Sequence, residues 1–385
     1  MRAASARRFC DFLVEHSLVL PVGAIVALAW ANTFAAQYAR LSGALRFIVN
    51  DVGMAFFFAL ATKEVVEATI PGGALHSWRR AALPAVAATG GMIGPATLYM
   101  ALIHLWHQPL LADGWAIPCA TDIAFSYLVA KAIFGNGHPA IPFLLLLAIV
   151  DDALGLVLLA AFYPVGDLHL VAGGGLMAAA VTVSAILRRR RIMSFWPYVA
   201  IGGAASWCAL YVGGLHPALA LVPIVPFLPH APRDPGLFVA APPGARDPLS
   251  ELEHRWKYPV QIVVLLFGLV NAGVAVQDVG TVTWAVLWAI LAGKPIGIVS
   301  SVGIAVAAGL YLPERVTWRD VIVVGFTAAI GFTVALFFAT VAFPVGPLLN
   351  QAKMGALLSV SGSAAALLMA GLLRVGRFGR RARHP

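Results

Sequence analysis

Runs of about 20 apolar residues recur along the chain, and each is long enough to cross the hydrocarbon core of a bilayer as a helix. The composition agrees with this interpretation, because 61% of the residues are hydrophobic and only 11% are charged. Soluble domains, by contrast, carry about 25% charged residues. The sequence therefore predicts an all-α membrane protein.

The apolar runs predict about twelve transmembrane helices. Their expected ranges are 17–37, 48–66, 82–104, 115–135, 140–163, 168–187, 194–212, 214–228, 259–278, 281–309, 318–343 and 352–373. The range 214–228 is the shortest of them, and it contains Pro217, Pro223 and Pro226. We expect all twelve to form one transmembrane domain over residues 17–373.

The basic residues predict the topology, since cytoplasmic segments of membrane proteins are enriched in lysine and arginine. With both termini in the cytoplasm, Arg40, Arg46 and Lys353 are the basic residues that fall outside. Lys63 and Lys294 fall within helices, and the rest of the 26 lysines and arginines lie on the cytoplasmic side. The net charge of +9 is therefore explained by membrane orientation, and we expect no nucleic-acid partner.

The same topology defines the segments outside the membrane. We expect a cytoplasmic N-terminal tail at 1–16, a cytoplasmic linker at 230–258 and a basic cytoplasmic tail at 374–385. The linker is rich in proline and glycine, and it is too short to form a separate domain.

Three aspartates interrupt the apolar runs. Asp122 lies in TDIAF, and Asp151 and Asp152 lie in AIVDD about thirty residues later. A charged side chain at the centre of a membrane helix costs roughly 2.5–3.5 kcal/mol, so it indicates function. Lys294 is the one base at similar depth, so a purely structural role would leave the acids poorly compensated.

Asp151 and Asp152 are adjacent, so on a helix they project about 100° apart. One can face a cavity while the other contacts a neighbouring helix. Two carboxylates this close exchange protons as a coupled unit. Protons and a small hard cation would compete for the same oxygen atoms, and such competition is sufficient for exchange transport.

Two of the predicted helices contain signals for a break. Pro118 precedes Asp122 by one turn and removes an amide donor, and Thr121 adds a hydroxyl beside it. The second break is expected at Gly331 and Thr333 in the range 318–343. Interrupted helices in two repeats indicate a transporter site, so we predict inverted repeats whose broken helices cross at mid-membrane. Asp122 would neutralise the converging helix N-termini. The alternative is a kinked helix in which Thr333 bonds to its own preceding turn.

Five ordered segments resemble the sodium/proton antiporters of the NhaA type. They are GWAIPCATDIAF (114–125), LLLLAIVDDALG (144–155), FGLVNAGV (267–274), AGKPIGI (292–298) and GFTVALFFATVAF (331–343). The resemblance covers nearly the whole membrane region. It implies an electrogenic antiporter of the bacterial inner membrane that exchanges cytoplasmic Na⁺ or Li⁺ for external H⁺, with no cofactor and no enzymatic activity.

The resemblance also implies residue roles. Asp152 matches the principal cation ligand, Asp151 its partner carboxylate, and Thr121 a further residue of the cation site. Lys294 matches a lysine that pairs with the position of Asp151, and Asp122 matches the acid that compensates charge in the break. Asp51 matches an acid at the outer end of the second helix, and some members form homodimers.

One region departs from the resemblance. Residues 62–68 read TKEVVEA, where the family commonly reads GLEVKRE. Glu64 is kept there, and together with Glu253 and His254 it is expected to line a cytoplasmic funnel. We expect the transport site to follow the family, but not its pH regulation. Alternatively, Lys63 and Glu64 extend towards the membrane interface as solvated side chains.

Two other functions are compatible with buried acids. A sodium-coupled symporter of an organic anion would share the architecture, but it needs further polar groups for its solute. An intramembrane aspartyl protease would use two aspartates on adjacent helices. The Gly-x-Gly-Asp motif of such proteases is missing around Asp122 and Asp151.

Overall fold

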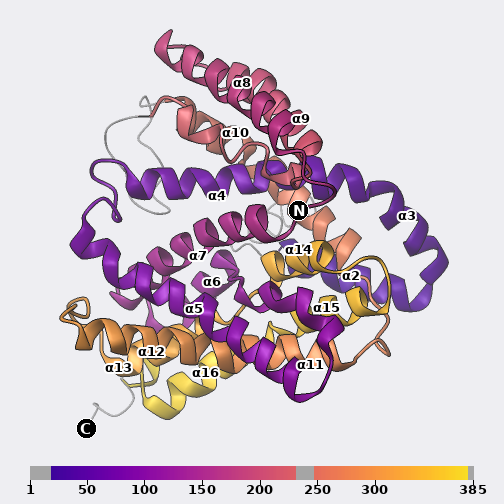
Figure 1. Cartoon of the computed structure of the whole chain (residues 1–385). Coiled ribbons are helices and arrows are strands. Elements are labelled where there is room, and N and C mark those ends of the chain that lie inside the picture. Colours follow the sequence, from indigo (N-terminus) through magenta and orange to yellow (C-terminus); the bar gives the residue numbers. More distant parts are fainter. Residues whose placement is uncertain (1–18, 231–246, 380–385) are drawn as a thin grey trace, which may run out of the picture.

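The computed structural model describes residues 19–230 and 247–379, and over these residues it is helical with no β-strand. This confirms the predicted all-α fold class. The predicted N-terminal tail at 1–16, most of the predicted linker and the last six residues of the basic tail lie outside the described residues. Figure 1 shows the helices of the first half crossing those of the second half in one bundle.

The elements of the first part of the chain are α2 (Val19–Thr33), α3 (Ala35–Phe47), η1 (Ile48–Gly53), α4 (Met54–Thr69), α5 (Trp78–Leu105), η2 (Pro109–Cys119), α6 (Ile123–Phe134), α7 (Ala140–Phe162), α8 (Leu170–Arg189), η3 (Tyr198–Gly203), α9 (Ala204–Gly213), η4 (Pro217–Leu219) and η5 (Val225–Phe227). The elements after residue 246 are α10 (Pro248–Asn271), α11 (Thr281–Trp288), η6 (Ala289–Gly293), α12 (Lys294–Ala307), α13 (Trp318–Ala328), α14 (Phe332–Ala342), α15 (Pro347–Leu358), α16 (Ser361–Leu373) and η7 (Gly376–Phe378).

Six helices of the described residues are long and apolar enough to span a membrane, or eight when each of two bent pairs counts as one span. The bent pairs are η2 with α6, at 56°, and α13 with α14, at 49°. The shorter apolar helix α2, the segment Tyr198–Gly213 and helix α10 account for three further predicted ranges. The predicted range 214–228 remains without a spanning helix.

The prediction of a helix over 214–228 is wrong. This segment forms only the short 3₁₀ turns η4 and η5, although most of it is buried. Pro217, Pro223 and Pro226 each lack an amide donor and clash with the preceding turn, so three of them in one short segment strongly disfavour a continuous α-helix.

Two other boundaries also differ from prediction. Helix α10 begins at Pro248, capped by the Asp247 side chain, which accepts a hydrogen bond of 2.7 Å from Ser250 N. The predicted linker at 230–258 therefore ends about ten residues too late. Between the predicted ranges 17–37 and 48–66 the structure has the helix α3 (Ala35–Phe47), which continues through η1 into α4. The residues of α3 are too polar to form an apolar run, so this helix was not predicted from the sequence.

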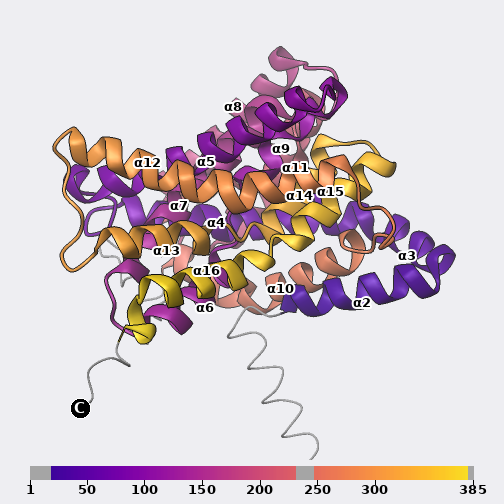
Figure 2. The ribbon, with the colours of Figure 1, turned by 90° about the horizontal axis from the view of Figure 1, so that it is seen from below.

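Helices α5 and α12 lie along each other (Figure 2), and glycines form the contact between them. Gly90 and Gly94 of α5 face Gly293 at the end of η6 and Gly297 in the first turn of α12. A Cβ atom on Gly94 would lie 2.7 Å from the Cα atom of Gly297, and one on Gly293 would lie 2.7 Å from the Cα atom of Pro95. Small residues four apart let membrane helices approach closely, and this contact brings Lys294 into the core.

The glycine contact between α5 and α12 generates a stability prediction. Gly94→Val would place a branched side chain against the α12 backbone, and forcing extra atoms into a packed interface costs about 1–3 kcal/mol. We expect a lower melting temperature and a lower yield of monodisperse protein in detergent. Gly303→Val, also on α12, is the matched control, because a Cβ atom there meets nothing within 4 Å. Equal melting temperatures of the two variants would contradict the packing role.

Candidate functional site

The break in the first bent helix lies between Cys119 and Ile123. Pro118 is in the last turn of η2, and Ala120 is extended, with a ψ of 149°. Asp122 caps α6, because its Oδ1 atom accepts a hydrogen bond of 3.1 Å from Phe125 N. The predicted broken helix is confirmed, with Pro118 just before the break.

The second bent helix breaks beside the first. Helix α13 ends at Ala328 and α14 begins at Phe332. The amide of Asp122 donates to the Ile330 carbonyl at 2.6 Å, and the Thr121 hydroxyl lies 3.2 Å from the Ala328 carbonyl oxygen. Helix η2 packs against α14 and α6 packs against α13, so the two broken helices cross at their breaks.

Asp122 is bound by the first turns of two helices. Its Oδ2 atom accepts the hydroxyl of Thr333 and, at 3.3 Å, the amide of Thr333. Helix N-termini carry a partial positive charge, so this carboxylate is stabilised by both α6 and α14. The alternative of Thr333 bonding to its own preceding turn is wrong.

Lys294 and Asp151 form a fully buried ion pair. The Lys294 Nζ atom lies 2.9 Å from Asp151 Oδ2, with 0% and 1% of the two side chains exposed. The Lys294 ammonium also donates to the carbonyl of Cys119, which the break leaves without a helical partner. The same Oδ2 atom of Asp151 accepts the Thr121 hydroxyl at 2.6 Å. Its Oδ1 atom has no partner among the described residues.

Asp152 is the one acid of the three without a polar partner in the described part of the chain. Both aspartates of α7 and Thr121 line a small cavity. The remaining wall is mainly apolar and includes Phe58, Leu159 and Phe338. A carboxylate in such surroundings binds a proton or a small hard cation, because burying an isolated charge is unfavourable.

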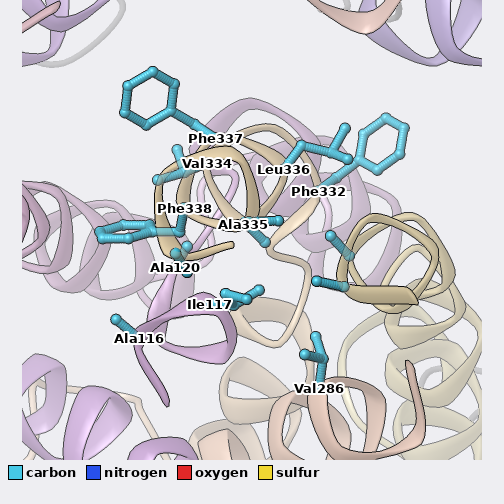
Figure 3. Close-up of a cluster of buried hydrophobic side chains, with 14 of the residues drawn as sticks. Ala116, Ile117, Ala120, Val286, Phe332, Val334, Ala335, Leu336, Phe337 and Phe338 are labelled. Atoms are coloured by element: carbon cyan, nitrogen blue, oxygen red, sulfur yellow. The ribbon is translucent and has the colours of Figure 1, made fainter. Parts of the chain in front are cut away.

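Helix α14 forms one side of this cavity and is itself enclosed. Its residues Phe332 to Ala339 are all buried. Figure 3 shows Phe337 and Phe338 leaving the helix on one side, and Phe332 and Leu336 on the other. Ala120 and Ile117 lie beneath Ala335 in the same view. The break is therefore held by packing all around it.

The three acids do not form a compact metal cluster, since the described residues contain no group of three His, Cys, Asp or Glu side chains suited to hold a metal ion. Asp122 accepts a hydrogen bond from Thr333, whereas Asp151 forms an ion pair with Lys294. The cavity therefore offers Asp152, the free oxygen of Asp151 and the oxygen of Thr121. Such a site has few oxygen atoms and suits transient binding.

A second charged cluster lies at the end of α4. The Nζ atom of Lys63 lies 2.5 Å from Glu67, 2.6 Å from Glu253 of α10 and 3.4 Å from Glu64. Lys63 is buried, so the alternative in which it extends to solvent is wrong. Glu64 and Glu253, two of the residues predicted to line a funnel, both contact the Lys63 ammonium, whereas His254 is exposed.

The sequence did not predict that Lys63 and Glu67 belong to this charged cluster. Their spacing of four residues is the usual signal for an ion pair on a helix. The contact with Glu253 could not be read from the sequence, because it joins residues 190 apart. Asn50, beside Asp51 in the π-helical η1, was also missed. It exchanges amide hydrogen bonds of 2.8 and 3.2 Å with Asn271 of α10.

Comparisons with known proteins agree with this geometry. A family model described as Na⁺/H⁺ antiporter 1 matches residues 8–373. The chain is 44% identical over 380 residues to the Na⁺/H⁺ antiporter NhaA of Geobacter metallireducens, covering 96% of this chain and 99% of that one. It is 43% identical over 385 residues to NhaA of Desulfitobacterium hafniense (strain DSM 10664 / DCB-2), covering 97% and 98% of the two chains.

A solved structure also shares the fold. The sodium proton antiporter MjNhaP1 of Methanocaldococcus jannaschii superimposes with a TM-score of 0.57 over 97% of this chain and 100% of that one. The sequence identity is 14%, so this likeness concerns the fold alone.

The buried ion pair generates the second prediction. Lys294→Ala leaves Asp151 buried without a counter-ion, and removing one partner of a buried pair costs about 3–5 kcal/mol. The melting temperature in detergent should fall clearly below that of Lys131→Ala, which removes an exposed lysine of α6. Adding Asp151→Asn to Lys294→Ala should restore part of the loss. Unchanged melting of Lys294→Ala would show that the pair does not stabilise the protein.

The Lys63 cluster generates the third prediction. Lys63→Met leaves three carboxylates together without their base, and we expect a loss of about 1–3 kcal/mol, since Glu253 is 43% exposed and partly screened. Thermal unfolding should show the loss, and Glu253→Gln in the same chain should reduce it. The control is Lys257→Met, an exposed position on α10. A melting temperature equal to that of the control would rule out a stabilising cluster.

Proposed function

The chain belongs to the Na⁺/H⁺ antiporter 1 family, and on this premise we propose that it exchanges cytoplasmic Na⁺ for external H⁺ across a membrane. It is a multi-pass membrane protein with several spanning helices. The observation that carries the exchange is Asp152, a carboxylate that has no polar partner among the described residues and lines the cavity beside Asp151. The Asp152 carboxylate can bind either Na⁺ or a proton, but not both at once.

Competition for these oxygens accounts for the coupling. Na⁺ is a hard cation and prefers oxygen ligands, and Asp152, the free Asp151 oxygen and Thr121 supply them. When the cavity opens to the other side, protons replace the cation on the carboxylates. The same site would accept Li⁺, which has the same charge and ligand preference.

Lys294 and Asp122 balance the charge of the site. Lys294 is the counter-ion of Asp151 before the cation binds. Asp122 keeps the N-terminal ends of α6 and α14 together and compensates their partial charges. Neither needs to bind the cation, so both can remain in place during the cycle.

We propose that the exchange is electrogenic, with more protons entering than sodium ions leaving. Each net charge that moves across the membrane is worth about 2.3 kcal/mol per 100 mV. A membrane potential that is negative inside would therefore drive Na⁺ out of the cell. This exchange would contribute to sodium and pH homeostasis.

The cluster at the end of α4 fits the cytoplasmic entrance to the site. Glu64, Glu67 and Glu253 surround the one base Lys63. An excess of negative charge at an opening raises the local concentration of cations. His254 would lie at the same entrance, on the exposed side of α10.

Several properties follow from the orientation of the basic residues and from the family. We propose a bacterial inner-membrane location with both termini in the cytoplasm, because basic residues favour that side. We propose that the lipid bilayer is the immediate partner, that the protein works without a resident cofactor and not as an enzyme, and that a homodimer is one form it adopts.

The two alternative functions have no support. The relatives are named as Na⁺/H⁺ antiporters, not as symporters or proteases. An organic anion would need polar groups, yet the cavity wall around the aspartates is mainly apolar.

The exchange is tested in proteoliposomes that hold an acid-inside pH gradient, reported by a quenched fluorescent dye. Adding Na⁺ or Li⁺ outside should dissipate the gradient for the native protein, and Asp152→Asn should abolish the response, because it removes the ionisable oxygen pair. Asp167→Asn, an exposed acid in a loop, is the matched control and should respond as the native protein does. A native protein indifferent to Na⁺, Li⁺ and K⁺ would refute the function. A fully active Asp152→Asn variant would refute the site.

A further inference from the structure

Gly155 lies on α7, about one turn after Asp151 and Asp152. Viewed down the helix axis, its direction falls between those of the two aspartates. At 3.6 residues per turn, it projects about 40° from Asp151 and about 60° from Asp152 around the helix axis. It also lines the same cavity as both carboxylates. Its position therefore faces the place where a substrate cation would approach Asp152.

Packing does not require glycine at this position. A Cβ atom built on Gly155 would meet only the Cε2 atom of Phe338, at 4.0 Å. At Gly94 and Gly293, by contrast, an added Cβ atom would collide with the backbone of the facing helix. Other helical glycines, such as Gly175 and Gly303, are equally unconstrained, but the open space at Gly155 belongs to the cavity that both carboxylates line.

A side chain at residue 155 would cover the aspartates. In an α-helix the Cα–Cβ bond tilts towards the N-terminus, so a residue covers the surface of the turn before its own Cα atom. For residue 155 that turn contains Asp151 and Asp152. The open space next to Gly155 therefore lies on the cavity side of the turn that carries both aspartates.

We propose that Gly155 is a specificity-determining residue, which sets the clearance over Asp151 and Asp152 and thereby the size of the alkali cation that binds. This inference rests on the proposed exchange of Na⁺ and Li⁺ for protons. Larger side chains at this position narrow the space between α7 and Phe338 of α14. The site then loses the larger ion first, so preference shifts from Na⁺ towards Li⁺.

The expected effect increases with side-chain size. One methylene group in a fitted pocket changes discrimination roughly 10–200-fold. Gly155→Val should therefore change the ratio of the half-maximal Na⁺ and Li⁺ concentrations by about tenfold or more in favour of Li⁺. Gly155→Ala should change this ratio in the same direction and by less.

The test uses the full chain in proteoliposomes and measures half-maximal Na⁺ and Li⁺ concentrations for the native protein, Gly155→Ala and Gly155→Val. Gly175→Val is the matched control, since Gly175 is exposed on α8 and a Cβ atom there meets nothing within 4 Å. Melting temperatures in detergent show whether each variant is folded. If Gly155→Val does not fold, Gly155→Ala decides the outcome.

A graded shift towards Li⁺ in folded variants, absent in Gly175→Val, supports the proposal. An unchanged ratio, an equal loss of both ions or a shift towards Na⁺ overturns it while the native protein still exchanges Na⁺. If the native protein responds to neither ion, the proposed function fails, and this inference fails with it.

Discussion

The ion pair between Lys294 and Asp151 is the interaction on which the rest of the structure depends. Both side chains are completely buried, and an ammonium ion at that depth is tolerated only when its charge and its hydrogen-bond donors are satisfied. The helix break supplies the Cys119 carbonyl, and Thr121 completes the partners of the shared Asp151 oxygen. The glycines at the contact of α5 and α12 let Lys294 come this close.

The two helix breaks expose backbone groups that the site then uses. In the hydrocarbon region every backbone N–H and C=O group needs a partner from the protein. The carbonyl of Cys119 accepts from Lys294, and that of Ile330 accepts from the Asp122 amide. Amides in the first turns of α6 and α14 donate to the Asp122 side chain. Asp122 and Lys294, which are predicted to act in transport, therefore also satisfy the backbone groups at the two breaks.

Much of the site could be predicted from the sequence, because placing a carboxylate or a lysine within an apolar membrane segment is energetically unfavourable and therefore indicates function. Asp122, Asp151 and Lys294 were identified in this way, as were both breaks. The cluster of Lys63 and Glu253 could not be predicted, because it depends on which helices become neighbours. The helix α3 and the early start of α10 were missed because both are too polar for an apolar-run criterion. Gly155 has no signal in a single sequence, since its importance lies in the space around it.

The contacts between the breaks have a mechanical consequence. Asp122 holds Thr333, its amide holds the Ile330 carbonyl, and Ser126 Oγ donates to the Thr327 carbonyl at 2.9 Å. Neither broken helix can rotate or slide alone without losing several of these buried bonds at once. We therefore expect the crossing to move as one unit, so that access changes through movement of the surrounding helices relative to it, or of the crossing as a whole.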